Sequence, residues 1–177
     1  MEDRASSPSH VTVRDCQTRL PRRSPIVRFH RGGGPLHRDD DLLFYEDGTV
    51  EIRLTTRERS RRFSFPKQMS LVDALLGYLF TSIRFFTLKS TYDQEEQYPS
   101  DLPLMAPVRA WRRSALDPIY VIRADVFNRH NEIAFSYSRC PDNLWRLRMV
   151  TDKLFYSADR LQQTNGQLLD VVSDLLV

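Results

Sequence analysis

The stretch from Pro118 to Val150 restricts the fold more than any other part of the sequence, because apolar and polar residues alternate along it. The alternation covers three runs, Ile119–Phe127, Glu132–Ser138 and Leu144–Val150. A period of two is typical of strands that bury one face of a sheet and expose the other. The pattern therefore predicts three antiparallel strands in this part of the chain.

One strand register brings the apolar residues of these runs together. We pair Phe127 with Glu132 and Ser138 with Leu144. One face then collects Ile122, Ala124, Val126, Ile133, Phe135, Tyr137, Trp145, Leu147 and Met149. The polar face carries three arginines, Arg123, Arg146 and Arg148.

A hairpin is expected earlier in the chain, around Asp47-Gly48. This dipeptide favours a tight turn, because both of its positions tolerate positive φ. The flanking runs are Leu42–Glu46 and Thr49–Leu54. With Glu46 opposite Thr49, one face holds Leu43, Tyr45, Val50 and Ile52, and the other holds Phe44, Glu51 and Arg53.

Two helices complete the expected fold. Apolar residues at helical spacing from Ser70 to Phe86 predict one long buried helix, with Ser70 and Asp73 as a capping box. Gln167–Val177 predicts an amphipathic C-terminal helix that docks on the sheet, whereas Lys153–Leu161 fits either a fourth strand or a helix. The fold class is α+β, with a hairpin and a three-to-four-stranded meander packed on the long helix.

The chain divides into an arm and one domain. Residues 1–40 are rich in arginine and proline and show no apolar period, so we expect a disordered basic arm in which Gly32–Gly34 is a flexible linker. Residues 41–177 form the domain, with an exposed loop at 92–107. Two cysteines, no signal peptide and no long apolar run indicate a protein that is neither secreted nor membrane-spanning.

Arginine supplies 23 of the 26 basic residues, although the net charge is only +3. The guanidinium fork binds phosphates and carboxylates in pairs, so clusters of arginine indicate anionic partners. The densest cluster is Arg57, Arg59, Arg61 and Arg62, and the arm contributes Arg19, Arg22, Arg23 and Arg28. A solvated loop and a codon bias of the genome are the alternative interpretations.

The meander bears on what kind of anion would bind. Proteins that read single-stranded RNA place aromatic residues between their basic residues, so that bases stack on them. In the expected register the aromatic residues lie on the buried face, opposite Arg123, Arg146 and Arg148. Base recognition is therefore disfavoured, and a contact with phosphates or lipid headgroups remains.

The sequence contains no motif of a known catalytic or metal site. Gly-rich phosphate loops, His-Glu-x-x-His and Cys-x-x-Cys are absent, and His130 and Cys140 fall at opposite ends of one expected strand. We expect no enzymatic activity, no cofactor, no metal and no small-molecule substrate.

The order of elements from Leu42 to Ser157, with the aromatic-rich strands and the stretch Phe63–Phe86, resembles the small matrix proteins of negative-strand RNA viruses. The rhabdovirus kind, and its plant-infecting branch in particular, is the most similar in size. Tyr98, Pro99 and Leu102 resemble a docking motif for membrane-scission adaptors, and the proline-rich tyrosine motif of the animal viruses is absent.

The resemblance implies a homo-oligomer that lies beneath a viral envelope, contacts acidic lipid and binds the nucleoprotein or RNA through charge. It implies a location in the virion and in the host cytoplasm or at the inner membrane surface, with the nucleus as a further site. Arg57, Arg59, Arg61 and Arg62 would be the first lipid or nucleocapsid contacts.

Two alternatives remain open at this point. The first is an arginine-rich RNA-binding viral regulator, such as a silencing suppressor or a host-response antagonist. The second is an interaction subunit of a larger complex, with the arm and the terminal helix as its docking elements.

Overall fold

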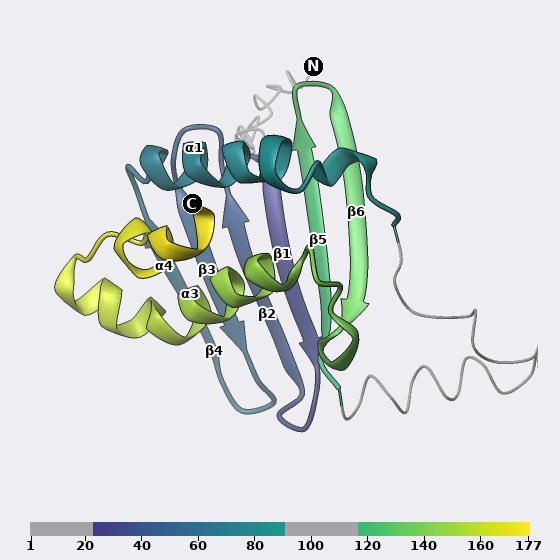
Figure 1. The fold of residues 1–177 in the computed structure, drawn as a ribbon. Helices are drawn as coiled ribbons and strands as arrows, with labels where there is room; N and C mark the ends of the chain where they lie inside the picture. The colour runs from purple at the N-terminus through teal and green to yellow at the C-terminus, as the bar shows by residue number, and fades with distance from the viewer. Residues whose placement is uncertain (1–22, 91–116) are drawn as a thin grey trace, which may run out of the picture.

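The computed structural model describes residues 23–90 and 117–177. They form one six-stranded antiparallel sheet in the order β4-β3-β2-β1-β5-β6, with helices on one face only (Figure 1). The strands are β1 (Val27–Gly33), β2 (Arg38–Phe44), β3 (Val50–Thr55), β4 (Ser60–Phe65), β5 (Ile119–Val126) and β6 (Arg129–Ser136). The predicted α+β class is confirmed.

Two helical segments cross the sheet, and a third lies between them (Figure 1). The first is α1 (Met69–Gly77), which continues as the π-helical turn η1 (Tyr78–Ser82) and is followed by the 3-10 turn η2 (Phe85–Thr87). The second is α3 (Trp145–Thr164), which follows the short turn η3 (Tyr137–Arg139). The C-terminal helix α4 (Leu169–Leu176) packs against both α1 and α3.

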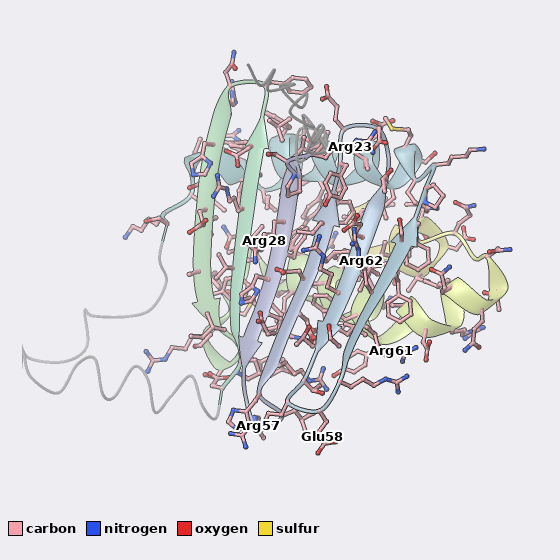
Figure 2. All side chains as sticks on the ribbon, turned by 180° about the vertical axis from the view of Figure 1, so that it is seen from behind. Arg23, Arg28, Arg57, Glu58, Arg61 and Arg62 are labelled. Atoms are coloured by element: carbon pink, nitrogen blue, oxygen red, sulfur yellow. The ribbon has the colours of Figure 1, made fainter. Side chains whose placement is uncertain are left out.

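The core lies between the sheet and these helices. Its largest fully buried side chains include Phe29, Phe44, Phe135, Leu42, Ile52, Ile122 and Ile133 from the strands and Leu71, Leu75 and Leu79 from the α1–η1 segment. No helix of the described residues lies over the opposite face of the sheet (Figure 2); we call it the uncovered face. Within the described residues, no helix combines the length and the hydropathy of a membrane span.

The expected arm is wrong for residues 27–40. Val27–Gly33 forms β1, which lies inside the sheet between β2 and β5. Val27 and Phe29 alternate with polar residues and are buried, so two apolar side chains and two strand partners suffice to order the segment. Gly33 and Gly34 have φ of 81° and 72° and form the β1–β2 turn, not a linker. Residues 1–22 and the expected loop at 92–107 lie outside the described residues.

The Asp47-Gly48 hairpin is present, but its register differs by one residue. The Tyr45 N–H donates to the carbonyl of Thr49 at 2.9 Å, and Phe44 pairs with Val50. Gly48, at φ 78°, supplies the left-handed residue of a three-residue turn. Leu42 and Phe44, not Leu43 and Tyr45, therefore share the helix-covered face with Val50 and Ile52.

The first two strands of the expected meander are confirmed as β5 and β6. Their turn is shorter than expected, because Val126 pairs with Arg129 around the two residues Phe127 and Asn128. The shift relative to the expected register is an even number of residues, so Ile122, Ala124, Val126, Ile133 and Phe135 keep the buried face.

The third expected strand is wrong, because Leu144–Val150 leads into and begins helix α3. Leu147, Val150, Leu154 and Ala158 are buried at helical spacing, and a seven-residue window cannot distinguish this spacing from strand alternation. The ambiguous segment Lys153–Leu161 belongs to the same helix.

The single long helix expected from Ser70 to Phe86 is not formed. Gly77 ends the regular α1, the π-helical turn follows, and Arg84 adopts a left-handed conformation with φ 49°. The expected capping box is absent, since α1 begins at Met69 after Gln68 without a side-chain cap. The expected C-terminal helix is confirmed, with Val172 and Leu175 buried in α4, but its main contacts are with α1 and α3 and not with the sheet on which we expected it to dock.

Candidate interaction surfaces

The uncovered face of the sheet carries many charges, and most of them are paired across or along the strands. Figure 2 shows this face with Arg28 on β1 and Arg62 on β4, two strands that are separated by β2 and β3. The ion pairs are Arg28–Asp41 at 2.8 Å, Arg62–Glu51 at 2.6 Å, Arg53–Glu51 at 3.0 Å and Arg123–Asp125 at 2.8 Å. The arginines of this face are therefore compensated by carboxylates.

Paired carboxylates of this face have pKa values below the ordinary range. Partial burial alone would raise the pKa of Asp41, but hydrogen bonds from His30 and Arg28 lower it below its ordinary value. The pKa of Asp125 is lowered in the same way, by Arg123 and His130 acting against partial burial. Because positive and negative side chains are paired on this face, it would attract an anion only weakly.

The strand geometry divides the predicted arginine cluster. Strand β4 begins at Ser60, so Arg61 and Arg62 point to opposite faces of the sheet. Arg61 binds Asp159 of α3, and Arg62 binds Glu51 on the uncovered face. Arg57 and Arg59 lie in the β3–β4 turn, are exposed, and have no ion-pair partner among the described residues.

The remaining predicted residues do not form one surface. Arg146 and Arg148 lie on α3, where Arg146 donates to the carbonyl of Val177 at 2.9 Å and the Arg148 guanidinium lies 4.3 Å from the Tyr137 ring centre. Arg23 pairs with Asp47 at 2.6 Å in the β2–β3 turn. Five predicted residues lie outside the described residues, namely Arg19, Arg22, Tyr98, Pro99 and Leu102.

One end of the sheet presents three phenylalanines, which we call the aromatic tip: Phe127, Phe80 and Phe86. Phe127 is the first residue of the β5–β6 turn and is 81% exposed. Its ring centre lies 6.1 Å from that of Phe80, and Phe80 lies 4.8 Å from Phe86. The Asn131 amide donates to the carbonyls of Phe85 and Leu88, which holds the η2 turn against β6.

Cations flank the aromatic tip. Arg129 follows the turn, and its guanidinium lies 5.8 Å from the Phe80 ring centre. Arg84 and Lys89 bracket η2 and are exposed. None of these three forms an ion pair among the described residues, and the neighbouring Asp125 is already paired with Arg123 and His130. The tip is apolar at its centre and basic around it.

The opposite end of the sheet contains a hollow of about 370 Å³ between the β1–β2 turn, the start of β5 and helix α3. We call it the tyrosine hollow. Leu36, Arg38, Tyr137 and Tyr156 line its rim, and Leu36, Tyr137 and Tyr156 are 58%, 47% and 71% exposed. Three of the seven exposed large apolar side chains of the described residues thus surround one recess.

A buried network of charges forms the floor of the hollow. Arg31 is only 3% exposed and donates to Asp40 at 2.7 Å and to Asp152 at 2.8 Å. The Tyr120 hydroxyl donates to Asp152 at 2.8 Å, and Asp40 accepts the Thr55 N–H at 2.9 Å. Burial and the nearby Asp152 raise the pKa of Tyr120, so its hydroxyl remains a donor.

Guanidinium groups also lie over the rings of the hollow. Arg38 is 5.8 Å and Arg31 is 5.7 Å from the Tyr156 ring centre. Arg148 lies over Tyr137, and its buried Nε has no hydrogen-bond partner in the part of the chain that the structure describes. Sequence reasoning missed this hollow because it placed Arg31 and Arg38 in a disordered arm and Tyr137 on a buried strand face.

The described residues contain no group of three or more His, Cys, Asp or Glu side chains that could hold a metal ion. Cys140 is a free thiol, and partial burial raises its pKa above the ordinary value. A protonated thiol is a weak nucleophile.

No protein-family model matches the chain, and no curated protein is significantly similar to it in sequence.

Proposed function

We propose that this chain is a non-enzymatic, matrix-like viral structural protein that self-associates on an acidic membrane surface and contacts a nucleocapsid. The single observation that carries the membrane contact is the aromatic tip, where an exposed Phe127 stands among flanking cations. Aromatic residues beside Lys and Arg are the composition of segments that lie in the interface of an anionic bilayer.

The conformation of Phe127 supports this proposal. Phe127 and Asn128 have φ of 50° and 60°, the pair of left-handed residues that a two-residue turn of this type requires. Asn suits such a position, whereas a bulky Phe is strained there by about 1–2 kcal/mol. Because the side chain is 81% exposed, it recovers little of this cost by burial in the fold. A surface that covers the ring would explain its presence.

The strength of one such contact argues for self-association. Burial of one Phe contributes about 1.5–3 kcal/mol, and each cation near an anionic bilayer contributes at most about 1 kcal/mol. A single tip with three cations therefore corresponds to a dissociation constant between millimolar and micromolar. Stable attachment requires several copies that bind together, because linked weak sites gain avidity.

A membrane contact at the aromatic tip would place the proposed nucleocapsid contacts, Arg57 and Arg59, far from the membrane. Strand β5 has eight residues, so the two ends of the sheet are about 25 Å apart. The β3–β4 turn, which contains Arg57 and Arg59, lies at the end opposite the β5–β6 turn (Figure 1), and Figure 2 shows Arg57 there. A flat bilayer at the tip would leave these arginines facing away from the membrane, on the side where a nucleocapsid would lie.

Vesicle flotation tests the proposal. The purified protein is mixed with vesicles of phosphatidylcholine alone or with 30% phosphatidylserine, a composition of about one anionic lipid in three. We expect flotation with the anionic vesicles only, and we expect Phe127→Asn to abolish it, since Asn keeps the turn conformation and removes the ring.

Tyr156→Ser is the matched control, because it removes an exposed aromatic ring from the other end of the sheet. Flotation of this variant should equal that of the unmodified protein. If Phe127→Asn floats normally, the aromatic tip is not the membrane contact. If no variant floats and the protein binds RNA as a monomer, the RNA-binding regulator is the better interpretation.

A further inference from the structure

The tyrosine hollow brings together the side chains that a single-stranded nucleic acid binds. Proteins that bind single strands combine aromatic rings, on which bases stack, with arginines that follow the phosphate backbone. Tyr156 and Tyr137 supply exposed rings, and Arg38 lies at the rim beside them. We propose that this hollow accommodates a nucleotide of a single-stranded nucleic acid. The proposal does not depend on the membrane contact.

The Tyr156 ring is accessible for stacking. Tyr156 projects from α3 and is 71% exposed, so a base can reach its ring beside the guanidinium groups of Arg31 and Arg38. The Tyr120 ring stacks on Phe135, at 5.6 Å between ring centres and 5° between planes, and forms a rigid inner wall. Every base has a flat π-face, so stacking of this kind tolerates many sequences.

The charge of the hollow suits a phosphate. Its ionisable lining residues are Arg31, Arg38 and Asp152, which sum to +1. Asp152 is engaged by Arg31 and Tyr120, whereas Arg38 forms no ion pair among the described residues. Arg148 adds a cation beside Tyr137, and Asp40 balances it from behind Arg31.

The β1–β2 turn allows a backbone to approach the hollow closely. Gly33 and Gly34 line it and carry no side chain that would obstruct a ligand. The β3–β4 turn lies at the same end of the sheet (Figure 1), and Figure 2 shows Arg57 at this end. Arg57 and Arg59 therefore add exposed cations at the end of the sheet that contains the hollow.

The same observations favour a single strand over a duplex or a membrane. Bases in an A-form duplex are stacked on one another and cannot reach a tyrosine in a recess. A bilayer is flat and contacts convex tips more readily than a recess with a charged floor. This conclusion reverses the expectation from the sequence, in which aromatic and arginine residues were on opposite faces.

Fluorescence anisotropy with labelled 12-nucleotide probes tests the proposal on the full-length protein. The probes are oligo(U) RNA, oligo(A) RNA, single-stranded DNA and an RNA duplex of the same length. We expect both single-stranded RNAs to bind more tightly than the duplex, and Tyr156→Ala to weaken their binding about tenfold. Tyr156→Phe should retain binding, because it keeps the ring.

Matched variants make the result specific to the hollow. Phe127→Asn, at the other end, should bind RNA like the unmodified protein, and Arg38→Gln should reduce the slope of log K against log salt by about 0.7. Tyr137→Ala provides a second ring deletion if Tyr156→Ala fails to fold. Equal affinity for duplex and single strand, or unchanged affinity in both ring deletions, overturns the proposal. Loss of vesicle flotation in Tyr156→Ala would also overturn it, in favour of a membrane contact.

The DNA probe shows whether the hollow distinguishes single-stranded DNA from single-stranded RNA. Equal binding of DNA and RNA indicates that stacking and phosphate contacts dominate, as the hollow predicts. Preference for RNA indicates an additional contact with the 2′-hydroxyl. Absence of binding to every single-stranded probe at low salt overturns the proposal.

Discussion

The two ends of the sheet both expose aromatic rings next to cations, yet they are built in opposite ways. At the aromatic tip the Phe127 ring is 81% exposed, and both left-handed residues of the turn, Phe127 and Asn128, carry side chains. The tyrosine hollow is concave, its turn combines Gly33 and Gly34 at φ 81° and 72° with His37 at φ 46°, and buried charges form its floor. Similar side chains thus occur in two shapes: a protruding apolar ring suits a fluid interface, whereas a recess with fixed donors suits a discrete ligand.

The largest expected effect concerns the charged floor of the hollow. Arg31→Met leaves Asp40, which is 2% exposed, with the Thr55 N–H as its remaining partner. Removal of one partner from a buried ion pair costs about 3–5 kcal/mol of the free energy of unfolding. Urea denaturation measures this loss. Arg62→Met, which breaks an exposed pair, is the control and should change the midpoint little. Equal losses of unfolding free energy in the two variants would show that the buried ion pairs of Arg31 stabilise the fold no more than an exposed pair does.

The next effect concerns the glycine turn. Gly34→Ala places a Cβ 2.9 Å from Cγ of Pro118 at a backbone φ of 72°, so we expect a loss of about 1–2 kcal/mol of unfolding free energy. Gly77→Ala is the matched control. Gly77 is helical, and its added Cβ would meet nothing within 4 Å, so this change should stabilise the protein by about 0.5–1 kcal/mol. Thermal unfolding of both variants checks the opposite signs.

A substitution in the turn of the aromatic tip should raise the free energy of unfolding, whereas Gly34→Ala should lower it. Phe127→Asn replaces a strained residue with one that tolerates φ 50°, so the free energy of unfolding should rise by about 1 kcal/mol. The same variant should lose vesicle flotation. A gain in stability together with a loss of binding would mark Phe127 as a residue kept for contact. A fall in stability would show that packing on Phe80 outweighs the strain, and the comparison between the two turns would fail.

The sequence predicted the alternating strands well, since Ile122, Val126 and Ile133 share a face that depends only on parity. The sequence analysis failed at β1, where the strand buries a charged residue. Val27, Phe29 and Arg31 are spaced as on one face of a strand. The sequence cannot show that Arg31 is buried, because its partners Asp40 and Asp152 come close only in the folded protein.

The interaction surfaces were predictable only in part. Arg57 and Arg59 were named from the density of arginine, and they are the members of that cluster that form no ion pair among the described residues. Leu144–Val150 was assigned to a strand because a short apolar run fits both periods. That assignment moved Arg148 to the wrong element and hid its contact with Tyr137.

A smaller effect is expected on the uncovered face, where Asp41 should make the stability depend on pH. The pKa of Asp41 lies below its ordinary value of 3.8, because hydrogen bonds from His30 and Arg28 outweigh partial burial. The carboxylate therefore stabilises the fold above the ordinary pKa, and this contribution is lost as the pH falls through the lowered pKa. Asp41→Asn should reduce stability at pH 7 and flatten the acid limb of the stability curve below about pH 4. An unchanged acid limb in urea titrations from pH 2 to 7 would exclude this role.

The smallest expected effect on the fold concerns the β3–β4 turn. Arg57→Gln together with Arg59→Gln removes two exposed cations without an ion-pair partner among the described residues, so the unfolding midpoint should not change. Binding of single-stranded RNA should lose about 1.4 in the slope of log K against log salt, since each phosphate contact contributes about 0.7. Arg84→Gln together with Arg129→Gln removes the same charge from the aromatic tip and should leave that slope unchanged. Equal slopes in the two double variants would mean that RNA responds to the total charge of the protein, and the two ends would then not be distinct surfaces.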